Sequence, residues 1–264
     1  MAITSLSDYY AAARQTLTIA RLASITGVAG MFSEILHLAG TPGSGTLAGT
    51  NTANGVVPTD ATAGFPPIAA FSGTKGYLNS VTFSNSVTCR LRLVDVLFKA
   101  GAYSYNSNVT LASQPSYSSR VPGGTDYRGT EIWLEAVTAF TGNQSIAITY
   151  VDQDNNTAES TGTIATGIAP IVGRMYQIPF NAGDCGVRQI NVVTATNATV
   201  GTFNVLVLRP LWEGMVTLAY TGDTHGPEKT GMPEVFADSA LALLVQPVST
   251  ATGLPAARFT IIDK

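Results

Sequence analysis

The feature that most constrains this chain is a series of short segments, from Gly76 onward, in which apolar and polar residues alternate. A period of two places alternate side chains on opposite faces of an extended strand, so each segment is predicted to be a β-strand with one buried face. The segments cover residues 77–83, 87–98, 131–140, 145–152, 175–180, 187–195, 203–211, 241–248 and 257–262.

Polar turn signals separate these segments, among them Gly142-Asn143, Asp154-Asn155-Asn156 and Gly183-Asp184. Many short strands with short polar turns and little helix predict a mainly β fold, a β-sandwich or jelly roll. Within residues 87–98, Cys89, Leu91 and Leu93 fall on one face and Arg90 and Arg92 on the other, as a half-buried strand requires.

The N-terminal segment has a different pattern. Ser5 can cap a helix that continues to Leu22, because Tyr10, Ala13, Leu17 and Ala20 recur at helical steps of three and four. A second short helix is expected over residues 31–37, and a loop rich in Gly, Thr and Ser follows. We therefore expect three parts: an N-terminal helical arm at 1–40, an extended connector at 41–75 and a β-sandwich domain at 76–264.

Composition indicates what kind of surface this fold carries. The chain of 264 residues is 45% hydrophobic but 12% charged, about half the charged fraction of an average soluble domain. Such a surface suits a subunit covered by copies of itself or by neighbours, and the arm is expected to dock on a neighbouring subunit. Lys and Arg are scattered and no stretch of 18 apolar residues occurs, so neither a nucleic-acid nor a membrane partner is expected. The N-terminus lacks the pattern of a signal peptide.

Two long loops, 102–129 and 221–238, are the expected contact regions, since long loops on a rigid sandwich often bind partners. Their alternative role is to pack back on their own sheet. Tyrosine suits recognition because it combines a large ring with a hydroxyl group. The candidate interface residues, in the arm and these loops, are Tyr9, Tyr10, Leu17, Tyr103, Tyr105, Tyr117, Tyr127, His225 and Phe236.

Residues that could carry chemistry are scarce. There are two His, and the two cysteines, Cys89 and Cys185, are expected to be reduced, so no metal site and no cofactor are predicted. The run 152–156 resembles the start of a calcium loop but lacks its later ligands, which favours a hairpin turn. A Ser/His/Asp set around His225 and Asp223 lacks any supporting motif, and we expect no enzymatic activity.

The segment 131–137 offers a binding face. Glu131, Trp133 and Glu135 fall on one side of the predicted strand, opposite Ile132 and Leu134. An acidic face with a tryptophan can bind sugar, and the alternative is a polar sheet face that contacts a neighbouring subunit.

Several stretches resemble a family of tailed-bacteriophage virion proteins. The resemblance extends roughly from Phe32 to the C-terminus and lies in a strand with an aspartate before an aromatic residue, an acidic Trp-Leu-Glu strand, a Tyr-x-Asp-Gln-Asp turn, an Ala-Gly-Asp-x-Gly-Val-Arg turn and an apolar strand ending near an arginine. The matching stretches are residues 92–98, 131–135, 148–154, 182–188 and 206–211. Cys185 departs from the family, where a polar residue is usual, and the connector is long.

The resemblance implies a structural component of the virion, assembled in the cytoplasm of a bacterial host, with no catalytic residues. The expected function is a non-enzymatic subunit, a capsid decoration or minor capsid (cement) protein, that forms homo-oligomers and binds the major capsid protein or other virion proteins. The alternatives are a tail component (tube, hub or baseplate) and a glycan- or receptor-binding module that uses Trp133, Tyr103 and Tyr105.

Overall fold

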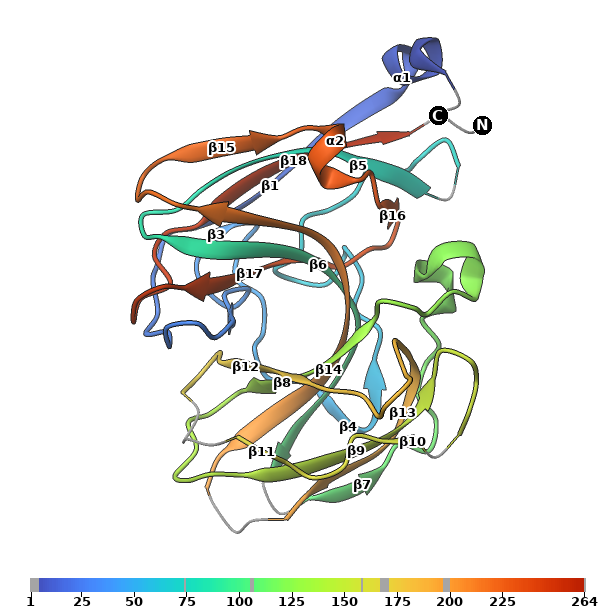
Figure 1. The fold of residues 1–264 in the computed structure, drawn as a ribbon, viewed down its shortest axis with the longest axis vertical. Coiled ribbons are helices and arrows are strands. Elements are labelled where there is room, and N and C mark those ends of the chain that lie inside the picture. Colours follow the sequence, from blue (N-terminus) through green and yellow to red (C-terminus); the bar gives the residue numbers. More distant parts are fainter. Residues whose placement is uncertain are drawn as a thin grey trace.

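The computed structural model describes residues 5–263 apart from 74, 105–106, 158, 167–170 and 197–199. Antiparallel strands form three sheets, so the mainly β fold predicted from the sequence is confirmed. In Figure 1 the sheets make two lobes, one above the other, joined by long curved strands. Among the described residues, no helix is long and apolar enough to cross a membrane.

The terminal sheet contains strands from both ends of the chain and forms much of the upper lobe in Figure 1. Its strand order is β15-β5-β18-β1-β3, and β16 also pairs with β5. The bounds are β1 (Ala13–Arg21), β3 (Gly40–Thr41), β5 (Lys75–Ser84), β15 (Gly222–His225), β16 (Glu234–Phe236) and β18 (Ala256–Asp263).

The central sheet joins the two lobes through β6 and β14, which pair along most of their length. Its order is β12-β8-β14-β6-β17-β2, with β4 beside β6. The bounds are β2 (Ser33–Glu34), β4 (Asn51–Val56), β6 (Cys89–Ser104), β8 (Glu131–Ala136), β12 (Met175–Ile178), β14 (Thr202–Val216) and β17 (Leu241–Pro247).

The distal sheet closes the lower lobe. Its order is β10-β9-β13-β7, and β11 also pairs with β9. The bounds are β7 (Asn108–Thr110), β9 (Ser145–Asp152), β10 (Glu159–Ser160), β11 (Ile164–Ala165) and β13 (Val187–Ala195). The helices are α1 (Leu6–Ala11), α2 (Pro227–Thr230) and the 3-10 turns η1 (Ser118–Arg120) and η2 (Pro122–Gly124).

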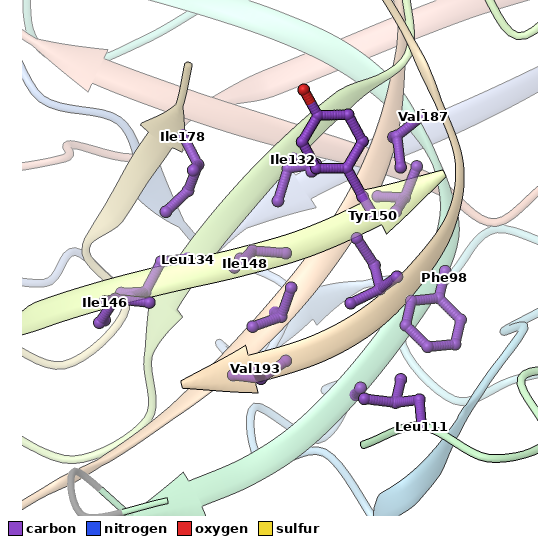
Figure 2. Close-up of a cluster of buried hydrophobic side chains, with 14 of the residues drawn as sticks. Phe98, Leu111, Ile132, Leu134, Ile146, Ile148, Tyr150, Ile178, Val187 and Val193 are labelled. Carbon is purple, nitrogen blue, oxygen red and sulfur yellow. The ribbon is translucent and has the colours of Figure 1, made fainter. Parts of the chain in front are cut away.

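Three apolar clusters hold the sheets together. One lies between the terminal sheet and the central sheet and includes Phe83, Leu91 and Phe259. The second lies between the central and distal sheets, and Figure 2 shows part of it, with Ile148 and Tyr150 of β9 among its residues. The third is on the opposite face of the central sheet, beneath residues 32–65. The single sandwich expected from the sequence is therefore a pair of sandwiches that share the central sheet.

The helix expected over residues 5–22 is wrong beyond α1. Residues 13–21 form β1, which pairs with β18 over eight residues, and Leu17 and Ile19 lie in the core of the terminal sheet. The helical steps that we read in this segment coexist with a period of two at Leu17, Ile19 and Arg21, and the β-branched Thr16 and Thr18 favour the strand. Residues 13–21 of the expected arm are thus a core strand of their own subunit.

The helix expected over residues 31–37 is also wrong. Ser33 and Glu34 form β2 against β17, and Phe32 packs in the third cluster against Trp133, with ring centroids 5.6 Å apart. Gly30 adopts a φ of 76°, which turns the chain into this extended segment. The connector after it covers the central sheet rather than leaving the domain.

Candidate functional site

The candidate interface rings in the long loops are part of the core. Tyr103, Tyr117 and Tyr127 are buried, and the hydroxyls of the first two donate to the backbone oxygens of Thr52 (2.9 Å) and Val187 (3.0 Å). A buried ring cannot present its surface to a partner, so these residues fix the loop to its own sheets. This is the alternative role that the sequence left open.

The other candidates are divided between core and surface. Leu17 and Phe236 are buried, and the Arg209 guanidinium lies 5.1 Å from the Phe236 ring. Residues 221–238 form β15, α2 and β16 along β5. Phe236 is buried in β16, whereas residues 221–224 are exposed. Tyr9 is half-buried and Tyr10 is exposed, both on α1. Tyr105 lies outside the described residues.

His225 is held by its neighbours on the surface of the upper lobe. Its Nδ1 accepts a hydrogen bond from Trp212 Nε1 (3.0 Å), and its Nε2 lies 3.5 Å from a carboxylate oxygen of Asp223. The ring also packs edge-on against Phe83. Both nitrogens are engaged, so this histidine positions β15 on β14.

The face of β8 with Glu131, Trp133 and Glu135 is covered by the chain's own residues. Trp133 is 2% exposed, and its indole donates to Glu131 Oε2 (2.7 Å) beneath the guanidinium of Arg92. Glu135 is completely buried. The expected sugar-binding or neighbour-binding face is wrong, because the segment that begins at Phe32 packs over it.

A buried ionic centre lies where the two lobes meet. Each carboxylate oxygen of Asp95 has two partners. Oδ1 lies 2.9 Å from the Arg120 guanidinium and accepts a hydrogen bond from the amide of Ala240 (2.9 Å). Oδ2 accepts a hydrogen bond from the Ser239 hydroxyl (2.8 Å) and lies 3.5 Å from the Arg209 guanidinium. Asp95 is on β6 opposite Arg209 on β14, so the centre ties both long strands to the 234–240 segment. We call this group the Asp95 centre.

Arg120 extends the Asp95 centre to other parts of the chain. Its side chain is fully buried and donates to the backbone oxygens of Pro58, Val96 and Asp238. The connector, β6, η1 and the loop before β17 therefore meet at one guanidinium. Burial lowers the pKa of Arg209, and the charge of Asp95 opposes that shift.

A second ionic group, which we call the Glu135 centre, lies beneath the connector. Lys99 Nζ is 3.2 Å from Glu135 Oε2, which also accepts from Asn204. Burial raises the pKa of Glu135, against the effect of Lys99, and the nearby Glu34 raises it further. The ring of His37 is 2.5 Å from Glu34 Oε2, and this hydrogen bond raises the pKa of His37 above its usual 6.5.

Asn204 links the Glu135 centre to the connector. Its side chain donates to the backbone oxygen of Leu47 (2.7 Å) and accepts from the amide of Gly49 (2.8 Å), while Lys99 donates to the backbone oxygen of Thr46 (3.3 Å). These contacts hold residues 46–49 against the central sheet. Neither centre was predicted from the sequence, although the apolar strand before Arg209 was a visible signal.

Other sequence expectations concern metals and thiols. Cys89 and Cys185 are free thiols, as expected, and burial raises the pKa of Cys89. Asp152 Oδ1 accepts from the amides of Asp154 (2.9 Å) and Asn156 (2.7 Å), so the run 152–156 is the predicted hairpin turn between β9 and β10. In the part of the chain that the structure describes, no cluster of three or more His, Cys, Asp or Glu side chains is placed to bind a metal.

Comparisons with known proteins identify no family for this chain. No family model matches the chain, and no curated protein matches it. The similar solved structures are viral particles. Particles of T=1 symmetry derived from infectious bursal virus match with 10% identity and a TM-score of 0.18, over 95% of this chain and 78% of the other. The T13 particle of infectious bursal disease virus matches with 9% identity and a TM-score of 0.19, over 96% and 78%. Scores of this size do not establish a common fold.

Proposed function

We propose that this chain is a non-enzymatic structural subunit of a virion. More specifically, we propose a capsid decoration or minor capsid (cement) protein of a tailed bacteriophage, assembled in the host cytoplasm, that binds copies of itself and the major capsid protein. The observation that carries the proposal is that Asp95, Glu131, Glu135, Asp152, Asp184 and Arg209, which lie in the stretches that resemble the phage family, all bind other parts of their own chain.

Charged residues in the first motifs form contacts between strands of the same chain. Asp95 and the nearby Arg209 form the ionic joint between the lobes. Glu131 and Glu135 hold Trp133, Arg92 and Lys99 on the central sheet. These residues connect the chain's own strands, which supports a structural role.

The two turn motifs brace the distal sheet. Asp152 closes the hairpin after β9 with backbone hydrogen bonds. Asp184 accepts a hydrogen bond from the hydroxyl of Tyr150 (2.5 Å), whose oxygen in turn accepts from the amide of Asn181 (2.9 Å). The motif at 182–188 thus ties a surface turn to the core of the lower lobe.

The low charge of the chain supports an assembled state. Part of the 12% charged content lies inside the subunit, in Asp95, Arg120, Glu135 and Arg209, which leaves the exterior still poorer in charge. Depletion of charged residues distinguishes the centre of protein interfaces from ordinary surface. Many copies on a symmetric shell can multiply modest contacts of this kind.

The residues proposed for glycan binding are not available on the surface that the structure describes. Trp133 and Tyr103 are buried, and stacking on a sugar requires an exposed ring. Tyr105 lies outside the described residues.

Mass spectrometry of purified virions from the encoding virus, with antibody-gold labelling in electron micrographs, tests the proposal. We expect the chain in the particle at on the order of hundreds of copies, as shell symmetry requires, with label over the head. Label confined to the tail would replace the decoration role with a tail role. Absence from purified virions, together with failure to bind empty capsids, would overturn the structural function.

A further inference from the structure

One end of the upper lobe is made of four turns that contain no Asp, Glu, Lys, Arg or His. The turns are residues 22–31, 84–89, 214–222 and 247–257. Exposed turns are normally where a soluble protein places its charges. We call this surface the neutral end.

Hydrogen bonds place the four turns together. The amides of Tyr220 and Val248 donate to the backbone oxygens of Asn85 (2.8 Å) and Thr88 (3.2 Å). The amide of Leu254 donates to Ser86 Oγ (2.9 Å). Residues 22–31 join the group because the amide of Ile25 donates to Thr252 Oγ1 (3.0 Å). The turn at 84–89 is thus the centre of the neutral end.

The neutral end exposes large apolar side chains. The exposed fractions are 78% for Leu22, 65% for Leu218, 83% for Tyr220, 58% for Val248 and 45% for Leu254. Single exposed apolar residues are ordinary, but a set that gathers on an uncharged end marks a contact surface.

The backbone at Tyr220 is a second, independent sign. Tyr220 has a φ of 62°, in the left-handed region where Gly or Asn is comfortable and a bulky residue is strained. Its ring has little burial within the subunit to compensate for that strain. Residues held in such conformations cluster at functional sites such as ligand clamps and switch regions.

The opposite end of the same sheet carries α1. Strand β1 runs from α1 to the neutral end, and its nine residues span about 30 Å. Figure 1 shows α1 projecting beyond the terminal sheet, away from the neutral end. None of residues 6–11 is buried, and a helix this short is unstable without packing.

The free face of α1 is apolar. Leu6 and Tyr10 are 68% and 69% exposed and lie four residues apart, on one side of the helix. The guanidinium of Arg14 turns back to the oxygen of Tyr9 (3.1 Å) and lies 5.3 Å from the Tyr9 ring. The face with Leu6 and Tyr10 therefore needs a partner surface that is also apolar and uncharged.

We propose that α1 of one copy docks on the neutral end of the next copy, with Leu6 and Tyr10 packed against Leu218 and Tyr220. The inference rests on the proposed function as an assembling subunit and names the contact that assembles it. The two surfaces lie at opposite ends of β1, so one copy cannot satisfy both, and the four turns of the neutral end contribute no charged side chain to the contact. Such a head-to-tail contact produces rings or open chains rather than a closed two-fold dimer.

Two variants of the full chain test the contact. Leu6→Ser with Tyr10→Ser removes the helix face, and Leu218→Ser with Tyr220→Asn removes the neutral-end anchors while Asn suits the left-handed backbone. By sedimentation velocity across concentration, we expect wild type to form species larger than dimers. Each variant alone should associate at least about tenfold more weakly, as loss of buried anchors predicts.

Mixing the two variants tests whether the contact is head-to-tail. Each retains one working surface, so an equimolar mixture should form one-to-one dimers and nothing larger. Val200→Ser, which removes a 73% exposed apolar side chain from the lower lobe, is the matched control and should associate like wild type. Circular dichroism and thermal melting verify that all variants remain folded.

Two results would overturn the inference. A helix-face variant that still associates like wild type would show that the neutral end pairs with something other than α1. A wild-type chain that stays monomeric at every concentration would remove the contact altogether. Recovery of that monomer in virions would leave the structural function standing, whereas head-to-tail chains in solution without any presence in virions would remove the virion role alone.

Discussion

The Asp95 centre and the Glu135 centre lie on the same pair of long strands, yet they are built differently. In the first, both carboxylate oxygens of Asp95 have two partners each, from three segments of the chain. In the second, Glu135 Oε2 is bound by Lys99 and Asn204, but Oε1 has no hydrogen-bond partner among the described residues.

The difference indicates which of the two centres depends on pH. Asp95 faces the guanidinium groups of Arg120 and Arg209, and its oxygens have no histidine partner. The Glu135 centre places Glu34 and Glu135 near one lysine and one histidine, so its balance depends on whether His37 carries a proton. We therefore expect the Asp95 centre to lock the two lobes and the Glu135 centre to hold the connector in a pH-dependent way.

The largest effect is expected from Asp95→Asn. The substitution leaves Arg120 and Arg209 buried without a counter-charge, and removing one partner of a buried ion pair costs about 3–5 kcal/mol. Urea unfolding should show this loss of stability. Asp223→Asn, at a carboxylate that is 57% exposed beside His225, is the matched control and should change stability by less than about 1 kcal/mol. Equal effects of the two substitutions would show that the Asp95 centre is not a joint.

An intermediate effect is expected from Lys99→Met. Loss of the ammonium leaves Glu135 buried beside Glu34, and we expect a cost of about 2 kcal/mol, because an unpaired buried charge is expensive. Adding Glu135→Gln should recover at least half of the loss, since the amide needs no counter-charge. A double variant as unstable as Lys99→Met alone would contradict the pairing. Urea midpoints of the four chains give the coupling directly.

The sequence predicted the strands far better than their partners. Residues 145–152 and 187–195 were placed within their exact bounds, and the alternation of Leu91 and Leu93 with Arg90 and Arg92 holds. A period of two is a local signal that survives packing. The sequence predicted one two-sheet sandwich, and the division into three sheets was missed. Sheet membership depends on which distant strand is adjacent, and β1 pairs with β18 at the other end of the chain.

The candidate site was harder to predict for the same reason. Tyr103, Tyr117 and Tyr127 have the composition of a binding loop, but burial depends on where the loop lies, and it lies over the lower lobe core. Asp95 and Arg120 are 25 positions apart and carry no motif that joins them. The start of the helix that carries Tyr10 was predicted because a cap is a local signal, and the cap is present, with Ser5 Oγ accepting from the amide of Asp8 (3.1 Å). The interface role of Tyr10 stays a prediction.

The smallest expected effect is a pH dependence at His37. Its pKa is raised in the folded state, so its stabilising contribution is complete below pH 6.5 and is lost as pH rises through the folded pKa. The groups that face it are Glu34, Glu135 and Lys99. The melting temperature should therefore fall as pH rises above 6.5, by less in His37→Gln than in wild type.

The raised pKa of Glu135 acts in the same direction but in a different window, because a carboxyl with a raised folded pKa loses stability as pH rises from 4.5. The His37→Gln chain should keep that acidic part of the profile and lose the part above pH 6.5. Melting curves of both chains from pH 4 to 8 separate the two groups. If the slope above pH 6.5 persists in His37→Gln, the proton belongs to Glu135, and the Glu135 centre responds through this carboxyl rather than through its histidine.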